Sequence, residues 1–321
     1  MRRVGGEMEA KRGEAFSYMT DSGRSSLRLI LRSGLKSKRF LVPDFLCKVI
    51  LDVLDEAGVS YSFYGIKDDL SIDKKTISGG KFDVFYSINY FGQRNKIPAQ
   101  VTGDKIVIED YAFSPLLPER PSGVKRWVTF NSLRKISPLA DGSLLRSSFE
   151  LSGGLVKKQE PPFSKLKYDA KEIKYKYLFE HKFSENRYLA LFKKAEGLLD
   201  RQKEIYGISG RSLFGLLDFY ANLDREYSIR RRNFEALRDC LKRDSINAVK
   251  DYHSFFVLTV DKRDELREYL FSKKTFLPVH WPRIEGLENG LYDRAISIPV
   301  DSRYSRGDMA GVARLINGFY K

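Results

Sequence analysis

Cysteine and histidine are scarce in this sequence, and their spacing matches no metal site or disulfide framework. The 321 residues include two cysteines, Cys47 and Cys240, and three histidines. Two cysteines so far apart provide no disulfide framework, which fits a reducing compartment. No Cys-x-x-Cys pair is present and the histidines are scattered. We therefore expect no metal site.

Long apolar runs are also missing. No stretch approaches the roughly 18 apolar residues that a membrane-spanning helix requires. The N-terminal segment MRRVGGEMEAKRGEAF is basic but lacks the apolar core of a signal peptide. The sequence therefore predicts a cytoplasmic protein without a membrane span.

Acidic residues are outnumbered by basic ones. The chain has 57 Lys and Arg against 42 Asp and Glu, a net charge of +15. Such a protein is attracted to nucleic acids, anionic membranes or phosphorylated small molecules. The basic residues are spread from end to end and no nucleic-acid-binding motif is present, so we expect no nucleic-acid partner.

Helical and strand patterns alternate in the first half of the chain, which predicts a parallel or mixed α/β sheet. Predicted helices cover 21–35 and 45–58, and predicted strands cover 38–45, 59–66, 81–92, 105–112 and 126–133. Long helical patterns then dominate, at 185–207 and 223–244, followed by strands at 253–260 and 295–300 and a closing helix at 306–321. We expect a large domain over 1–185, and connecting helices with a small α+β domain over 186–321.

Three short segments carry candidate chemistry. In SGRSSL, Gly23 precedes a helix start, where free backbone amides and the helix dipole attract an anion. In VIEDYA, Asp110 ends a buried strand and lies over the sheet edge. In FNSLRKISPLADGSLL, Lys135 follows a strand and is flanked by apolar and hydroxyl residues, which favour a lowered pKa and a nucleophilic amine. Taken singly, these residues also fit a helix cap, a loop acid and a solvated cation.

The order of these segments is what makes them informative. A phosphate-binding turn, an acid for a ring nitrogen and a lysine for an aldehyde are the three contacts that pyridoxal 5′-phosphate (PLP) requires. With FLVPDFLCKVILDVLDEAG, YFGQ, FLPVHWP and SIPVDSRYSRGDM, the set resembles the DegT/DnrJ/EryC/StrS family of sugar aminotransferases over roughly residues 6–321. The resemblance implies a fold-type-I PLP-transferase fold, with a three-layer α/β/α large domain and a mixed, mostly parallel sheet.

The resemblance also implies residue roles. Lys135 matches the lysine that holds PLP as a Schiff base, and Asp110 matches the aspartate at the pyridine nitrogen. The remaining implied cofactor and substrate positions are the phosphate turn Gly23, Arg24 and Ser25, the ring-facing Cys47, and His280 near the substrate entrance. Two positions depart from the family pattern: Phe113 stands where Gln or His is usual, and Phe130 where a serine is usual, so that Thr129 or Ser132 is expected to replace that serine.

These roles predict a PLP-dependent aminotransferase that acts as a homodimer. It would transfer an amino group from an amino acid such as glutamate to a keto sugar, nucleotide-linked, in surface polysaccharide or lipopolysaccharide biosynthesis. Two alternatives remain open: PLP-dependent carbanion chemistry of another kind, and a PLP-fold protein that has lost catalysis and serves as a binding or scaffold component. The departures at Phe113 and Phe130, and the lack of the family's Gly-Tyr-Asn-x-Arg-like segment, motivate the scaffold alternative.

Overall fold

The protein is described by a computed structural model over residues 15–77, 82–101, 103–118, 123–152, 156–247 and 252–321. The segment 1–14, which holds most of the stretch predicted not to be a signal peptide, lies outside these residues. Among the described residues, none of the helices is both long enough and apolar enough to cross a bilayer.

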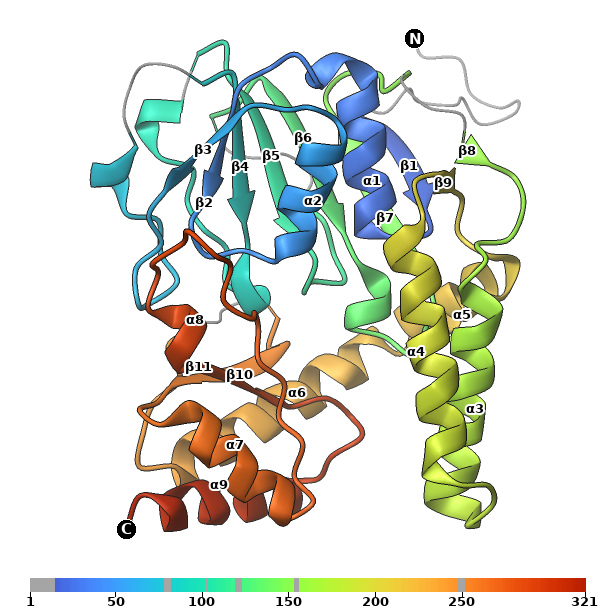
Figure 1. The fold of residues 1–321 in the computed structure, drawn as a ribbon, viewed down its shortest axis with the longest axis vertical. Helices are drawn as coiled ribbons and strands as arrows, with labels where there is room; N and C mark the ends of the chain where they lie inside the picture. Colours follow the sequence, from blue (N-terminus) through green and yellow to red (C-terminus); the bar gives the residue numbers. More distant parts are fainter. Residues whose placement is uncertain (1–14, 78–81, 102, 119–122, 153–155, 248–251) are drawn as a thin grey trace, which may run out of the picture.

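A seven-stranded sheet in the order β1-β7-β6-β5-β4-β2-β3 forms the centre of the large domain (Figure 1). Neighbouring strands from β3 to β6 pair in parallel, whereas β7 pairs antiparallel with both β6 and β1. The mixed, mostly parallel sheet predicted from the sequence is thus confirmed. The strands are β1 Phe16–Thr20, β2 Phe40–Pro43, β3 Tyr61–Tyr64, β4 Val84–Ile88, β5 Ile106–Tyr111, β6 Arg126–Asn131 and β7 Ser143–Ser147.

Helices α1 (Gly23–Ile30) and α2 (Lys48–Glu56) pack on one face of this sheet. Each presents apolar residues at helical spacing to the sheet, including Leu27 on α1 and Leu54 on α2, which are both buried. The side chain of Ser22 caps α1 by accepting a hydrogen bond from the backbone amide of Ser25. A serine in extended conformation is favoured at this position because its oxygen satisfies an amide that has no partner within the helix.

A helical hairpin, formed by α3 (Ser164–Glu180) and α4 (Glu185–Arg201), projects from the large domain beside the small domain (Figure 1). Two-residue strands flank it, β8 (Val156–Lys157) and β9 (Ile205–Tyr206), which pair in parallel. Phe163, Ala195 and Leu199 are buried toward the base of the hairpin and Tyr188 is buried near its tip, whereas most other described side chains of α3 and α4 are partly or fully exposed. The hairpin therefore stands largely free of the core, with one long side facing the rest of the molecule.

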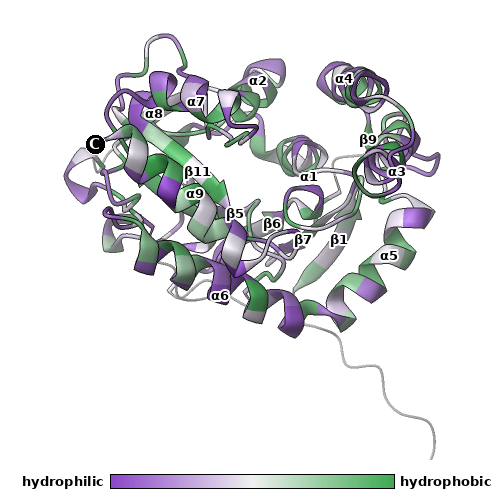
Figure 2. Ribbon diagram, turned by 90° about the horizontal axis from the view of Figure 1, so that it is seen from below, coloured by the Kyte–Doolittle hydropathy of each residue, from purple (hydrophilic) through white to green (hydrophobic). Residues whose placement is uncertain are grey.

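Helices α5 (Gly210–Ala221) and α6 (Leu223–Cys240) lead from the large domain to the small one. There, β10 (Phe255–Thr259) and β11 (Ala295–Pro299) pair antiparallel and pack with α6, α7 (Arg263–Ser272) and α9 (Arg306–Phe319) around a separate apolar core. The apolar strand β11 lies among these helices in Figure 2.

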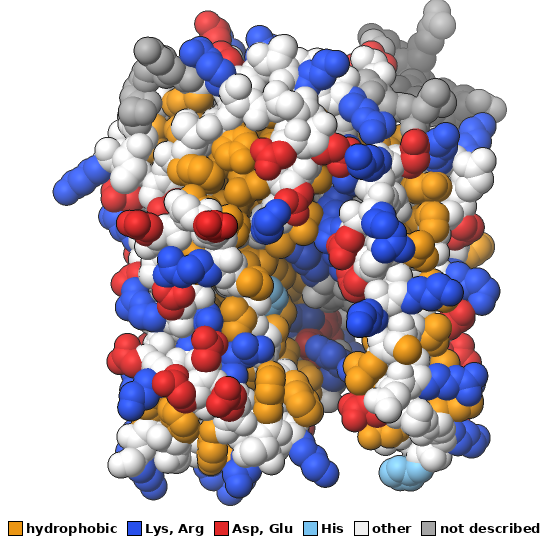
Figure 3. All heavy atoms as spheres, in the orientation of Figure 1, with side chains coloured by type: hydrophobic (Ala, Val, Ile, Leu, Met, Phe, Trp, Pro, Cys, Tyr) orange, Lys and Arg blue, Asp and Glu red, His pale blue; other side chains and the backbone are white. Residues whose placement is uncertain are grey.

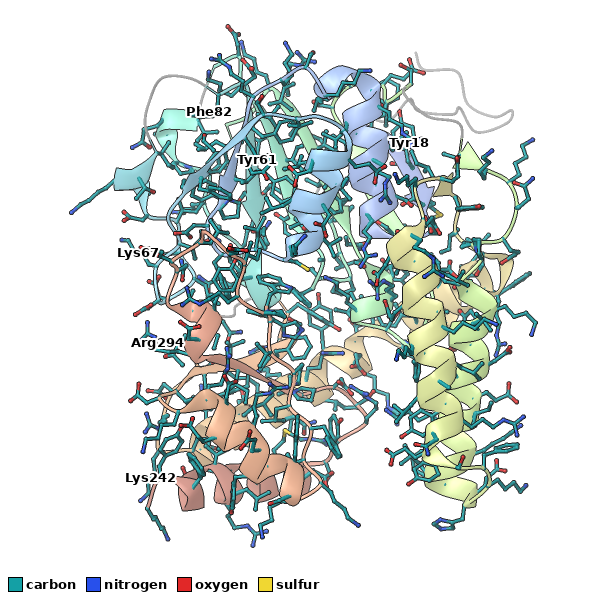
Figure 4. The ribbon with its side chains drawn as sticks, in the orientation of Figure 1. Tyr18, Tyr61, Lys67, Phe82, Lys242 and Arg294 are labelled. Atoms are coloured by element: carbon teal, nitrogen blue, oxygen red, sulfur yellow. The ribbon has the colours of Figure 1, made fainter. Side chains whose placement is uncertain are left out.

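The short helix α8 (Leu291–Arg294) joins the two domains. Arg294, labelled in Figure 4, forms an ion pair with Asp68 of the large domain at 2.8 Å, next to the labelled Lys67. The hydroxyl of the buried Tyr292 accepts a hydrogen bond from the amide of Leu46 at 3.0 Å and donates one to its carbonyl at 3.1 Å. The small domain therefore holds the loop before α2 in place.

Candidate active site

A cavity of about 110 Å³ lies where β4, β5 and β6 end and α1 begins. Ligands of α/β proteins bind beyond the carboxyl ends of parallel strands, which is where this cavity lies. Trp281 of the small domain closes part of it. Seven of the residues predicted from the sequence line the cavity: Gly23, Arg24, Cys47, Asp110, Phe113, Ser132 and Lys135.

Lys135 ends the 3₁₀ turn Leu133–Lys135 that follows β6. Its Nζ lies 4.8 Å from the centre of the Phe113 ring, and within the described residues it has no hydrogen-bond or ion-pair partner. Burial lowers the pKa of Lys135, and the nearby Arg134 guanidinium lowers it further. A lysine amine of lowered pKa with no acceptor of its own is suited to act as a nucleophile and as a proton carrier.

Asp110, the next-to-last residue of β5, lines the same cavity as this amine and is 6% exposed. Its Oδ2 accepts a hydrogen bond from the hydroxyl of Tyr86 at 2.8 Å, and its Oδ1 accepts one from the amide of Ala112 at 2.8 Å. Burial raises the pKa of Asp110, while the charge of Lys135 opposes that rise. The carboxyl group is therefore held in a fixed orientation, and a cationic partner in the cavity would favour its ionised form.

The N-terminus of α1 forms another wall of the cavity. The amides of Gly23 and Arg24 are in the first turn, where amides have no acceptor within the helix. A Cβ at Gly23 would lie 3.4 Å from the ring of Phe130 and 3.5 Å from the carbonyl oxygen of Asn131, which is ordinary van der Waals contact. The free amides of this helix start suit an anion.

Aromatic rings pack around Phe113 at the boundary of the two domains. Phe113 stacks on Phe91 with ring centres 5.1 Å apart, and it meets the imidazole of His280 edge-on at 5.3 Å. His280 also contacts the hydroxyl of Ser297 at 3.0 Å, and burial lowers its pKa to about 3. At neutral pH His280 is therefore a neutral packing group, and it does not line the cavity.

Two other predicted residues lie outside the cavity lining. Thr129 is fully buried within β6, and its hydroxyl has no partner among the described residues. The hydroxyl oxygen of Ser25 lies 3.4 Å from the hydroxyl oxygen of Ser22 and 3.4 Å from the side-chain amide nitrogen of Gln202. Of the two candidates for the missing serine, the structure thus brings Ser132 to the cavity and leaves Thr129 in the sheet.

Sequence reasoning missed two polar residues of the cavity, Arg134 and Tyr86. Arg134 precedes Lys135, and its Nε is buried without a partner in the described part of the chain, while one terminal nitrogen lies 3.7 Å from Glu196. Its position next to Lys135 in the sequence was the signal that could have identified Arg134 as a cavity residue. Tyr86 is fully buried in an apolar strand, and only the pairing of β4 with β5 brings it near Asp110.

Comparisons with known proteins bear on the fold. A scan of protein families finds no match to this chain, and a search of curated proteins finds none. Solved structures do match. DesV of S. venezuelae, solved in complex with a ketimine intermediate, is 15% identical at a TM-score of 0.64, covering 94% of this chain and 84% of its own.

Two further structures agree. A DegT DnrJ EryC1 StrS aminotransferase from Brucella abortus is 17% identical at a TM-score of 0.62, covering 94% of this chain and 85% of its own. DesI, solved in the presence of its TDP-sugar product, is 14% identical at a TM-score of 0.66, covering 94% and 79%. The chain therefore has the fold of these three proteins, and the predicted fold class is confirmed.

Proposed function

We propose that the protein is a PLP-dependent aminotransferase that acts on a sugar. The observation that supports this most directly is that the amine of Lys135, which has no hydrogen-bond or ion-pair partner among the described residues, shares one cavity with the buried carboxyl group of Asp110. A role in stabilising the fold does not explain this pair, because burying an amine without a hydrogen-bond partner destabilises the folded state. The shared fold with sugar aminotransferases agrees with this proposal.

The residues present fit PLP at three points. The open first turn of α1 at Gly23 and Arg24 suits the phosphate, with the unpartnered Nε of Arg134 on the same cavity. Asp110 is held by Tyr86 where it can pair with a ring nitrogen. The apolar side chains of Leu27, Ile50, Ile88 and Phe113 suit the faces of an aromatic ring.

The roles of the chain's own residues follow from this placement. PLP, when bound, supplies an electron sink for the carbon from which a proton is removed. Nζ of Lys135 would hold the cofactor and then carry the proton from one carbon to another, which its lowered pKa favours. Asp110 would hold a positive charge on the ring nitrogen. Trp281 would exclude water from the side of the small domain.

The substrates we propose are an amino-acid donor, glutamate, and a nucleotide-linked keto sugar. DesI was solved with its TDP-sugar product, and the net charge of +15 favours a phosphorylated ligand. A role in surface polysaccharide or lipopolysaccharide biosynthesis, in the cytoplasm, follows from the family resemblance.

A homodimer is part of the proposal. On α5, the large apolar side chains of Leu213, Phe214 and Leu217 are 45%, 79% and 71% exposed. Three such side chains on one helix form an apolar patch of the kind that protein interfaces cover. A second copy of the chain would bury it, and a mass of one chain in light scattering would contradict this part.

The scaffold alternative makes the opposite prediction for Lys135. If catalysis is retained, added PLP gives a red-shifted absorption band that borohydride fixes covalently to the chain, and Lys135→Ala loses both. Lys105→Ala is the matched control, since Nζ of Lys105 lies over the ring of Phe82 at 4.9 Å, far from the cavity. Equal labelling of the wild type and Lys135→Ala would count against the proposed function and favour a binding role.

A further inference from the structure

A cleft separates the α3–α4 hairpin from the rest of the molecule, and Lys and Arg side chains lie along its walls (Figure 3). Five cations of the hairpin and its surroundings lie close enough to act on one another electrostatically: Arg134, Lys167, Lys171, Lys174 and Arg303, here called the cation row. Three of them are on α3 at intervals of four and three residues, so they share one face of that helix. At 1.5 Å per residue, these three cover about 10 Å of helix.

The cation row begins at the candidate active site. Arg134 lines the cavity beside Lys135. Lys171 donates a hydrogen bond to the carbonyl of Leu139, in the loop that follows Lys135, at 3.1 Å. Arg303 belongs to the loop before α9, so the far end of the row lies between the hairpin and the small domain.

Carboxylates neutralise only part of this row. Glu196 contacts Lys167 at 2.6 Å, and Asp301 contacts Arg303 at 2.6 Å. Lys171 and Lys174 have no carboxylate within 4 Å among the described residues, although Glu185 acts on Lys174 from further away.

The excess of positive charge over carboxylates acts most strongly on Lys171. Burial lowers its pKa to about 8, and the cations Lys167, Arg303, Arg134 and Lys174 lower it further. The pKa of Lys167 is also lowered to about 8, by burial and by Arg134, with Glu196 opposing. Cations that lie close together at the wall of a cleft repel one another, which destabilises the protein without ligand. A bound polyanion removes this repulsion.

We propose that the cation row binds the pyrophosphate group of the sugar substrate, so that recognition comes from the hairpin and the Arg303 loop of the same chain. This deepens the proposed function and rests on it. A row of about 10 Å is longer than one phosphate needs, and it leads away from Lys135, where the sugar carbon would react. Nucleic acid is disfavoured because it requires cations along an open surface.

The test is calorimetric titration of the full-length protein with inorganic pyrophosphate, compared with inorganic phosphate at equal ionic strength. We expect pyrophosphate to bind at least tenfold more tightly. Lys171→Gln and Lys174→Gln should each weaken its binding roughly tenfold, as expected for loss of a hydrogen bond to a charged group. The second variant keeps the test valid if the first fails to fold. Lys165→Gln is the control, because Lys165 is on α3 but is 86% exposed and paired with Asp169.

Proton uptake provides an independent readout. Near pH 8, Lys167 and Lys171 are each about half protonated, and a bound anion raises both pKa values. Titrations in buffers of different ionisation enthalpy should therefore show uptake of up to about one proton per chain at pH 8, falling toward zero at pH 6. Equal binding of phosphate and pyrophosphate, unchanged affinity in both α3 variants, or no proton uptake would overturn the inference.

The same measurements separate this inference from the proposed function. Covalent capture of PLP by wild-type Lys135 without pyrophosphate binding would reject the cation row alone. Pyrophosphate binding without PLP capture would reject the aminotransferase proposal. Binding of a DNA duplex that is weakened by Lys171→Gln, with no binding of pyrophosphate, would show that the row serves a nucleic acid and would reject the substrate site.

Discussion

Asp21 lies directly before the N-cap residue of α1, and its burial predicts how the free energy of unfolding depends on pH. Its side chain is fully buried. One carboxylate oxygen accepts a hydrogen bond from Gln202 at 2.7 Å, and the other has no partner among the described residues. Burial, with a smaller contribution from Asp141, raises the pKa of Asp21 from 3.8 to about 6.

This shift makes stability depend on pH. The folded state binds the proton more tightly than the unfolded state does. The resulting stabilisation is therefore fully present below about pH 4 and is lost as pH rises through 6. A shift of about two units corresponds to about 3 kcal/mol in total, of which about 2 kcal/mol falls between pH 4.5 and 7.5.

Asp21→Asn removes the ionisation while keeping the size of the side chain. We expect its free energy of unfolding, relative to the wild type, to increase by about 2 kcal/mol from pH 4.5 to pH 7.5. Urea denaturation followed by tryptophan fluorescence measures this at each pH. Asp104→Asn, at an exposed aspartate before β5, should show no such trend. A difference between Asp21→Asn and the wild type that does not vary with pH would refute the reasoning.

Two further variants test the site and its domain junction. Asp110→Asn should still capture PLP through Lys135 but lose amino transfer on the order of 10²-fold, because the ring nitrogen loses its charged partner; an unchanged turnover rate would remove Asp110 from the site. Gly92→Ala should lower the free energy of unfolding by more than about 3 kcal/mol, since its φ is 90° and a Cβ would lie 1.6 Å from the carbonyl oxygen of Tyr252. Gly103→Ala, at φ 88° in open space, is its control and should cost only about 1 kcal/mol; equal losses in urea denaturation would contradict the steric argument.

The sequence predicted the elements whose own pattern is strong. The buried strands β5 and β6 are short apolar runs, and α1 combines a serine cap with apolar residues at helical spacing. These signals are local, because cap and periodicity lie within one element. The edge strand β1 was missed because Phe16 and Met19 are exposed and its five residues show no apolar run.

Residues whose partners come from distant segments could not be predicted. In the sequence, Asp141 is followed by Gly142, and an Asp-Gly pair is a local turn signal. In the structure it is fully buried and accepts hydrogen bonds from Ser209 and Ser212 at the start of α5, and from Ser164 at the start of α3. It thereby fixes the base of the hairpin and α5 beside the Lys135 loop. Nothing near Asp141 in the sequence indicates these contacts.

Lys135, Lys167 and Lys171 differ in their hydrogen-bond partners and not in the direction of their pKa shifts. Burial lowers the pKa of Lys135, Lys167 and Lys171 alike. A lowered pKa therefore does not identify the reactive amine, because two of these lysines already donate to an oxygen: Lys167 to Glu196 and Lys171 to the carbonyl of Leu139. Among the described residues, Lys135 alone of the three has no acceptor, and it shares the cavity with Asp110. The proposed nucleophile and the proposed binding groups are therefore distinguished by their hydrogen-bond partners and not by their pKa shifts.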